Sequence, residues 1–129
     1  MITTEYEKLA NLFNVNERPT LLSLKATQHS ALISMHVPIE LSWFEGHFPS
    51  QKVLPGVVQI DWAGKLGKTL FVDSGVFVQL SNIKFNNMVL PDTTLNLQLT
   101  YEVEKGRLKF HFFNESGTFS TGSFTFSPC

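Results

Sequence analysis

Apolar and polar residues alternate along several segments of the chain, and this period of two predicts β-strands. Two such segments come early, at residues 20–27 and 31–37, and the short polar turn between them predicts a hairpin. The others follow in the second half of the chain, at residues 77–85, 94–104, 107–113 and 117–126. Asn and Gly in the polar turn between the last two favour a tight connection. We expect this half to form an antiparallel meander.

Two other segments repeat their apolar residues with the period of an α-helix. The first dozen residues predict a short amphipathic helix, with apolar positions at Ile2, Tyr6, Leu9 and Phe13. A second helix of about 16 residues is expected from Pro55 onward, because apolar side chains there cover most of the helical circumference. The remaining stripe contains Asp61, Gly64, Lys65 and Lys68. This second helix should be largely buried.

One long buried helix beside several antiparallel strands predicts the α+β class. The simplest way to bury such a helix is to curl the sheet around it. No repeat, linker or low-complexity tract interrupts the pattern, so we expect a single domain over residues 1–129.

Composition and charge exclude several classes of function. Lys and Arg number 10 against 11 Asp and Glu, without a long basic cluster, so nucleic-acid binding is not expected. The single cysteine, Cys129, cannot form a disulfide within the chain, which favours a reducing cytoplasm. No apolar run suggests a secretory signal or a membrane span. His29, His36 and His111 lack the spacing of a helical metal site, so neither a metal nor another cofactor is expected.

His47 differs from the other histidines because it lies in an irregular, proline-rich segment just before the second helix. Pro55 and Gly56 open that helix, whose first N–H groups are suited to a developing negative charge. Asp61 stands among apolar residues and is either partly solvated, hydrogen-bonded or kept protonated as a proton donor. Pairing with Lys65 at i+4 is a simpler alternative. A base, an acid and an oxyanion site suit removal of a proton next to a thioester carbonyl, with departure of a β-hydroxyl.

The segment FEGHFPSQKVLPGVVQIDW, residues 44–62, resembles the active-site signature of the hotdog-fold 3-hydroxyacyl-acyl-carrier-protein dehydratases. Residues 81–102, SNIKFNNMVLPDTTLNLQLTYE, are similar to a strand, turn and strand of the same family. The helix sequence looks closest to the small dehydratases of aryl polyene biosynthetic clusters. The resemblance implies a sheet wrapped around the helix and dehydration of a 3-hydroxyacyl thioester to a trans-2-enoyl thioester, in fatty-acid or aryl polyene type biosynthesis.

The same resemblance implies roles for particular residues. His47 would be the general base and Asp61 the acid, while the Gly56 N–H would bind the thioester carbonyl. Val53 would orient the histidine ring through its carbonyl, and Val57 would complete the substrate-binding turn. The family also implies a dimer in which each site takes its histidine from one subunit and its acid from the other.

Departures from the family pattern affect the substrate and the partner. Lys52 replaces a usual proline, and we expect Lys52 and Lys84 to be possible contacts for an acidic acyl carrier protein. Lys65 replaces a usual glutamine, and an aspartate at position 61 leaves double-bond isomerisation open. Two alternatives to the dehydratase hypothesis are an acyl thioesterase and a non-catalytic hotdog subunit of a heterodimer. The sequence leaves open the acyl chain and the choice between a homodimer and a heterodimer.

Overall fold

The computed structural model describes residues 8–9, 11–44, 52–72 and 75–127, and its strands form one antiparallel sheet beside one long helix. The sheet has six strands in the order β1-β2-β4-β5-β6-β3. Their bounds are β1 Thr20–Ala26, β2 Ser30–His36, β3 Val76–Phe85, β4 Thr94–Glu102, β5 Arg107–Asn114 and β6 Gly117–Ser127. The helix, α2, spans Gly56–Phe71. Short 3-10 turns, η1 to η3, lie at Val15–Glu17, Ser42–Phe44 and Val103–Lys105. The predicted α+β class is confirmed.

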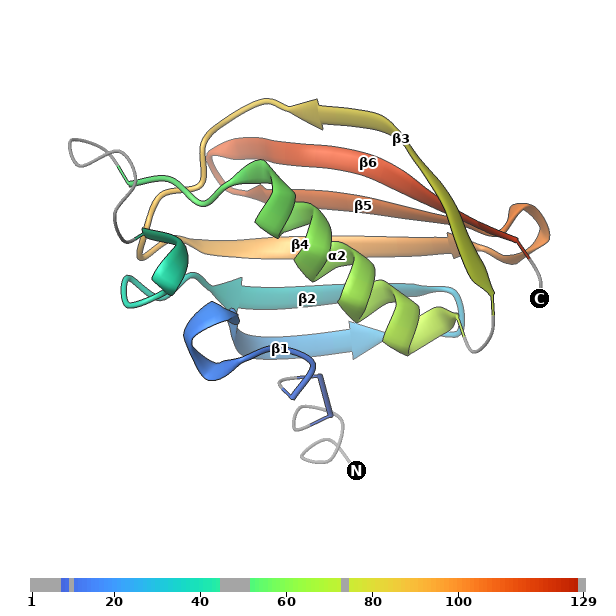
Figure 1. Ribbon diagram of the computed structural model, residues 1–129, viewed down its shortest axis with the longest axis horizontal. Coiled ribbons are helices and arrows are strands. Elements are labelled where there is room, and N and C mark those ends of the chain that lie inside the picture. The colour runs from blue at the N-terminus through green and yellow to red at the C-terminus, as the bar shows by residue number, and fades with distance from the viewer. Residues whose placement is uncertain (1–7, 10, 45–51, 73–74, 128–129) are drawn as a thin grey trace.

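Helix α2 lies diagonally across one face of the sheet and forms the core with it (Figure 1). The alternating residues of β2 and β4 that face the helix are at most 2% exposed: Ala31, Ile33, Met35, Leu95, Leu97 and Leu99. On the helix, Trp62 and Leu66 are fully buried against them. The helix therefore buries one side in the sheet, and its other side carries the polar stripe expected from the sequence.

The strand order corrects one expectation. Strands β4, β5 and β6 form the predicted meander, but β3 does not lie beside β4, its successor in the chain. It pairs antiparallel with β6 at the far edge of the sheet. The segment 86–93 then returns to β4, and on this path the Leu54 N–H donates to the Val89 carbonyl at 2.8 Å. This bridge connects the segment before α2 to the segment after β3.

One boundary also differs from the sequence prediction, and one predicted element lies mostly outside the described residues. The strand expected over residues 94–104 ends at Glu102, because Val103 enters the turn η3 and Gly106 then takes a left-handed φ of 60°. Most of the predicted N-terminal helix lies on residues 1–7 and 10, outside the described residues, while Lys8 and Leu9 are helical. No helix within the described ranges is both long and apolar enough to cross a bilayer.

Candidate active site

The predicted oxyanion donor lies at the first position of α2. Pro55 precedes the helix in an extended conformation, with φ −60° and ψ 146°, and its carbonyl accepts the N–H groups of Val58 and Gln59. The N–H groups of Gly56 and Val57 come before these two and have no carbonyl one turn earlier inside the helix. The helix dipole favours negative charge at this end. The backbone is thus compatible with an anion at Gly56.

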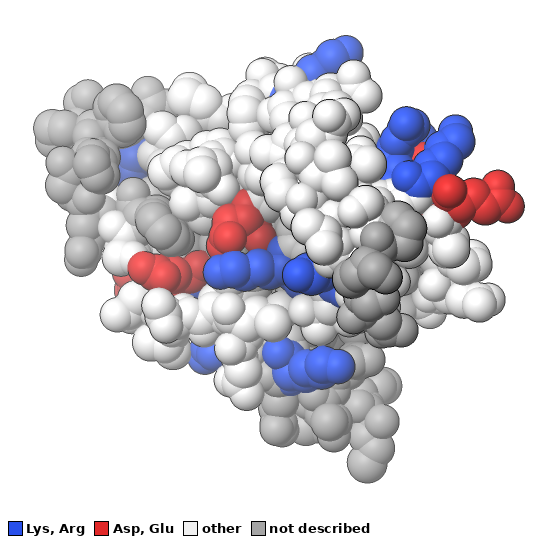
Figure 2. Space-filling view, turned by 45° about the vertical axis from the view of Figure 1, so that its right-hand side comes forward, with Lys and Arg blue, Asp and Glu red and all other residues white. Residues whose placement is uncertain are grey.

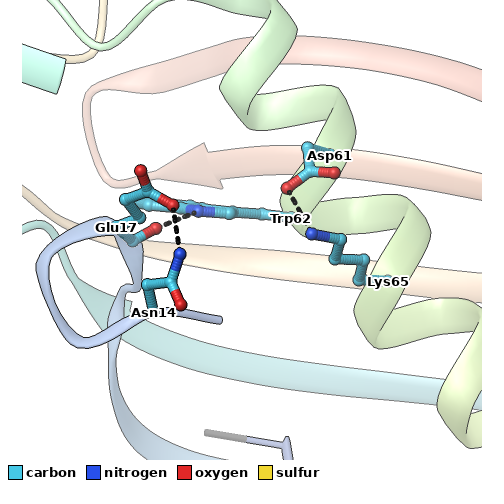
Figure 3. A network of polar contacts seen from close by, with 5 residues as sticks. All are labelled: Asn14, Glu17, Asp61, Trp62 and Lys65. Atoms are coloured by element: carbon cyan, nitrogen blue, oxygen red, sulfur yellow. Dashed lines mark hydrogen bonds and ion pairs between the residues drawn. The ribbon is translucent and has the colours of Figure 1, made fainter. Parts of the chain in front are cut away.

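Asp61 lies in the second turn of α2, and it is exposed and ion-paired. Its Oδ2 atom is 3.3 Å from Nζ of Lys65, one turn further along the helix (Figure 3). The two side chains are 46% and 49% exposed, so water screens the pair. Lys65 also lies over the ring of Phe13, with Nζ 5.4 Å from the ring centroid. Of the alternatives weighed from the sequence, the structure shows the solvated aspartate paired at i+4.

Trp62, the next residue, is completely buried and fixes the direction of this helix turn. Its indole N–H donates to the carbonyl of Glu17 at 3.1 Å, which attaches α2 to η1. Asn14, which precedes η1, donates from its side chain to Oε1 of Glu17 at 3.1 Å. Figure 3 shows Trp62 pointing toward η1 while Asp61 and Lys65 lie together on another side of the helix. Burial of Trp62 therefore leaves Asp61 facing outward.

An open apolar groove of about 380 Å³ runs beside Asp61. One wall is the flank of α2, and the other is formed by β3 and β6. Its lining residues are Val57, Ile60, Asp61, Gly64, Lys65, Lys68, Phe77, Leu80, Phe124 and Phe126. Figure 2 shows acidic and basic side chains meeting in the middle of a largely uncharged face. The groove can accept an apolar chain whose polar end lies near the charged side chains.

Aromatic rings form the outer wall of this groove. Phe77 makes edge contacts with Phe124 and Phe126, with ring centroids 6.2 and 6.1 Å apart. Phe124 and Phe126 are nearly buried, at 6% and 7% exposure, whereas Phe77 is half exposed. Phe124 and Phe126 therefore belong to the core and also line the groove.

The remaining predicted site residues, apart from His47, lie within the described part of the chain. Val57 is 71% exposed, although it belongs to the helix that we expected to be largely buried. Val53 is half-buried, and Lys52 and Lys84 are exposed. His47 belongs to residues 45–51, outside the described part of the chain, so its role stays a prediction.

The structure adds Gln59, a residue that the sequence analysis did not select. Its side chain is 3% exposed, in the first turn of α2. Oγ of Ser120 donates to its Oε1 at 2.7 Å, and its Nε2 donates to the carbonyl of Leu54 at 3.4 Å. The available signal was a polar residue among apolar positions on the side of the helix that also carries Ala63 and Leu66. Sequence alone could not identify Ser120, since it lies 61 positions after Gln59 in the chain.

Two of the other histidines, His36 and His111, have hydrogen-bonding partners away from the groove. His36 Nε2 lies 2.9 Å from Oδ1 of Asp92, and His111 Nε2 lies 2.9 Å from the hydroxyl of Thr118. Both residues sit in strands, as expected, on the side of their strand that faces away from the core. We assign them no part in the site.

Comparison with known proteins identifies the family. Residues 23–123 match the family model ApeI-like, described as ApeI dehydratase. The chain is 32% identical to a chain of the dehydratase heterocomplex ApeI:P from Xenorhabdus doucetiae, with a TM-score of 0.80 over 85% of this chain and 98% of that one. It is also 32% identical to an uncharacterised protein from Erwinia carotovora subsp. atroseptica, with a TM-score of 0.74 over 86% and 97% of the two chains.

Curated enzymes match over a shorter part. The 3-hydroxyacyl-[acyl-carrier-protein] dehydratase FabZ of Novosphingobium aromaticivorans is 30% identical over 81 residues, which are 56% of this chain and 51% of that enzyme. The chain spans only 16% of the bifunctional LpxC/FabZ enzymes that it also matches. The resemblance seen in residues 44–62 is confirmed at the level of the family. The chain has the hotdog fold and belongs to the ApeI-like dehydratase family.

Proposed function

We propose that the protein dehydrates a 3-hydroxyacyl thioester, carried on an acyl carrier protein, to the trans-2-enoyl thioester, in fatty-acid or aryl polyene type biosynthesis. The observation that carries the proposal is the position of Asp61. In a chain of the ApeI-like family, this carboxylate lies in the second turn of α2, at the edge of an open apolar groove. The N-terminus of the same helix offers N–H groups to a thioester oxygen. A carboxylic acid, an anion site and an apolar channel are what β-elimination from an acyl thioester requires.

The proposed roles follow the order of bond changes. His47 takes a proton from the carbon next to the thioester carbonyl, and the Gly56 N–H stabilises the negative charge that develops on the carbonyl oxygen. The bond to the β-hydroxyl then breaks, and the hydroxyl leaves as water with a proton supplied by Asp61. The Val53 carbonyl orients the ring of His47, and Val57 contacts the acyl chain where it enters the groove.

We further propose that the protein works as a dimer of hotdog chains, with a second chain seated on β3. This edge strand carries a row of exposed apolar side chains: Val76, Phe77, Val78, Leu80 and Phe85. An unpaired apolar edge strand is a surface that proteins normally cover. The same strand forms one wall of the groove, so a partner there would close the groove over Asp61. The ApeI:P neighbour is itself a heterocomplex, and the partner here is either a second copy or a related hotdog chain.

The carrier protein is proposed to dock near Lys52 and Lys84. Both lysines are exposed, and Lys84 lies near the end of β3, next to Phe85. Phe85 packs against Gly56 at the helix start, so a positive charge is available close to the proposed reaction centre. An acidic carrier protein would be attracted there at low salt, and the attraction would weaken as salt rises.

The test is turnover by the purified protein. The protein is incubated with alkyl and aryl 3-hydroxyacyl carrier thioesters, and formation of the conjugated enoyl product is followed. His47→Ala and Asp61→Asn are expected to lose turnover, by about 100-fold or more, while keeping the fold. His29→Ala and Asp92→Asn are matched controls, because they remove the same groups from positions outside the groove.

The outcomes separate the alternatives. Turnover that both site variants abolish and both controls retain supports the dehydratase. Release of free acid from the thioester, without an enoyl product, would instead identify a thioesterase. A folded dimer without turnover or hydrolysis on any of these thioesters would contradict the proposal and favour a non-catalytic hotdog subunit.

A further inference from the structure

We infer that Gln59 is a positioning residue for the dehydration, acting with Ser120 to hold the first turn of α2 in its working position; this inference rests on the proposed function. Gln59 itself faces the protein interior and does not line the groove. Its effect on catalysis must therefore pass through the backbone that it holds. That backbone includes Gly56, three residues earlier, and Asp61, two residues later.

The hydrogen bonds leave little choice of orientation for the Gln59 amide. The Leu54 carbonyl can only accept, so the amide nitrogen of Gln59 must point toward it, at 3.4 Å. This leaves the amide oxygen for the Ser120 hydroxyl, which donates at 2.7 Å. Ser120 is fully buried and Gln59 is 3% exposed, so water does not compete for either group. A buried polar pair of this kind strongly specifies one arrangement.

The pair connects three separate parts of the chain at the helix start. Ser120 lies on β6, Gln59 lies in α2, and Leu54 belongs to the segment before the helix. The Leu54 N–H is occupied as well, because it donates to the Val89 carbonyl at 2.8 Å. Both backbone polar groups of Leu54 are therefore held, one by Val89 and the other by Gln59.

A second contact from the same place in the sheet acts on the same helix turn. Phe85 pairs with Ser120 across β3 and β6. The ring of Phe85 lies against Gly56, and the hydroxyl of Ser120 holds Gln59. Two neighbouring residues of the sheet thus fix both ends of the first helical turn. A catalytic group displaced by about 1 Å can lose about 100-fold in rate, so this attachment has a direct consequence for turnover.

The experiment compares Gln59→Leu, Ser120→Ala and the double variant with the wild-type protein, in kcat, KM and thermal stability. Ser34→Ala is the matched control. Ser34 also donates from its hydroxyl to a side-chain amide oxygen at 2.7 Å, that of Asn96, but between β2 and β4 and away from α2. The Ser34→Ala variant therefore removes the same kind of hydrogen bond but leaves the start of α2 unchanged.

We expect Gln59→Leu to lower kcat by about tenfold or more with KM changed little, and Ser120→Ala to lower it less. The double variant should be no slower than Gln59→Leu, because each single change already removes the hydrogen bond between Gln59 and Ser120. Ser34→Ala should lower stability to a similar extent and leave kcat unchanged. Ser120→Ala, the smaller change, keeps the comparison valid should Gln59→Leu fail to fold.

Three results would overturn the inference. One is a kcat for both single variants within about twofold of wild type. The second is an equal loss of kcat in Ser34→Ala, which would indicate a general effect of stability. The third is losses that add in the double variant. A wild-type protein without turnover on any 3-hydroxyacyl thioester is a different result, since it refutes the proposed function on which the inference rests.

Discussion

Phe85 lies so close to Gly56 that a β-carbon at position 56 would come within 2.5 Å of the ring's Cζ atom. Real β-carbons do not make such contacts, so the ring occupies the space that any other side chain would need. The ring that would have to move for any larger residue at the start of α2 thus belongs to β3, 29 positions later in the chain.

This contact predicts the effect of Gly56→Ala. The stability change should stay below about 1 kcal/mol, because the ring is half exposed and its tip can move aside. The value of kcat/KM should fall by at least about tenfold, because the added methyl group crowds the proposed oxyanion donor. Both quantities are measured on the same preparation. Gly56→Ala combined with Phe85→Leu should recover part of the activity, and full activity of Gly56→Ala alone would contradict a role for this turn.

A second glycine, Gly106, contributes to the free energy of unfolding through its backbone conformation. Gly106 has φ of 60°, and a β-carbon there would lie 2.3 Å from the backbone carbonyl oxygen of Phe126. Backbone cannot move aside as a side chain can, so Gly106→Ala should cost about 2 kcal/mol or more of unfolding free energy. Urea denaturation measures the loss. Gly64→Ala, in α2, should stay within about 1 kcal/mol of wild type, since helix propensity offsets its contact with Phe124. Equal losses of unfolding free energy in Gly106→Ala and Gly64→Ala would refute this explanation.

The buried indole of Trp62 predicts a third effect. Trp62→Phe removes volume from a fully buried position together with the hydrogen bond to the Glu17 carbonyl. We expect a loss of about 1 to 3 kcal/mol in unfolding free energy. The urea midpoint should fall while the slope stays constant. An unchanged midpoint would show that the attachment of η1 to α2 contributes nothing to stability.

The ion pair of Asp61 with Lys65 should contribute little to stability. Both side chains are about half exposed and one helical turn apart, so Lys65→Gln should change the unfolding free energy by less than about 0.5 kcal/mol. Lys68→Gln, on the same flank of α2, is the matched control. Unfolding is measured at low and high salt. A loss well above that of the control, and only at low salt, would show that the pair is stronger than its exposure implies.

The proposed dimer is tested by a charge on β3. Val78→Lys should convert a dimer into a monomer in sedimentation velocity, because it places a cation on the exposed apolar edge strand. Val103→Lys is a close control: Val78 is 53% exposed and Val103 is 56% exposed, but Val103 lies in η3. A dimer that survives Val78→Lys and dissociates with Val103→Lys would place the interface elsewhere.

The sequence by itself determined the elements and much of the chemistry. Alternation over residues 94–102 identified β4, and the apolar circumference after Pro55 identified α2, because periodicity reports which side of an element is buried. The segment around Gly56 and Asp61 identified the family. The pairing of Asp61 with Lys65 at i+4 could also be predicted from the sequence, since it depends only on local helical geometry.

The tertiary structure alone decided how distant segments meet. Periodicity shows that β3 is a strand but not which strand it joins. In the structure β3 pairs with β6, and the connection over residues 86–93 returns past the helix start to β4. That placement brings Phe85 onto Gly56, sets Ser120 against Gln59, and leaves the apolar side of β3 open beside Asp61. Such contacts join residues far apart in the chain, so their geometry follows from the packing of the whole sheet against α2 and from no local pattern.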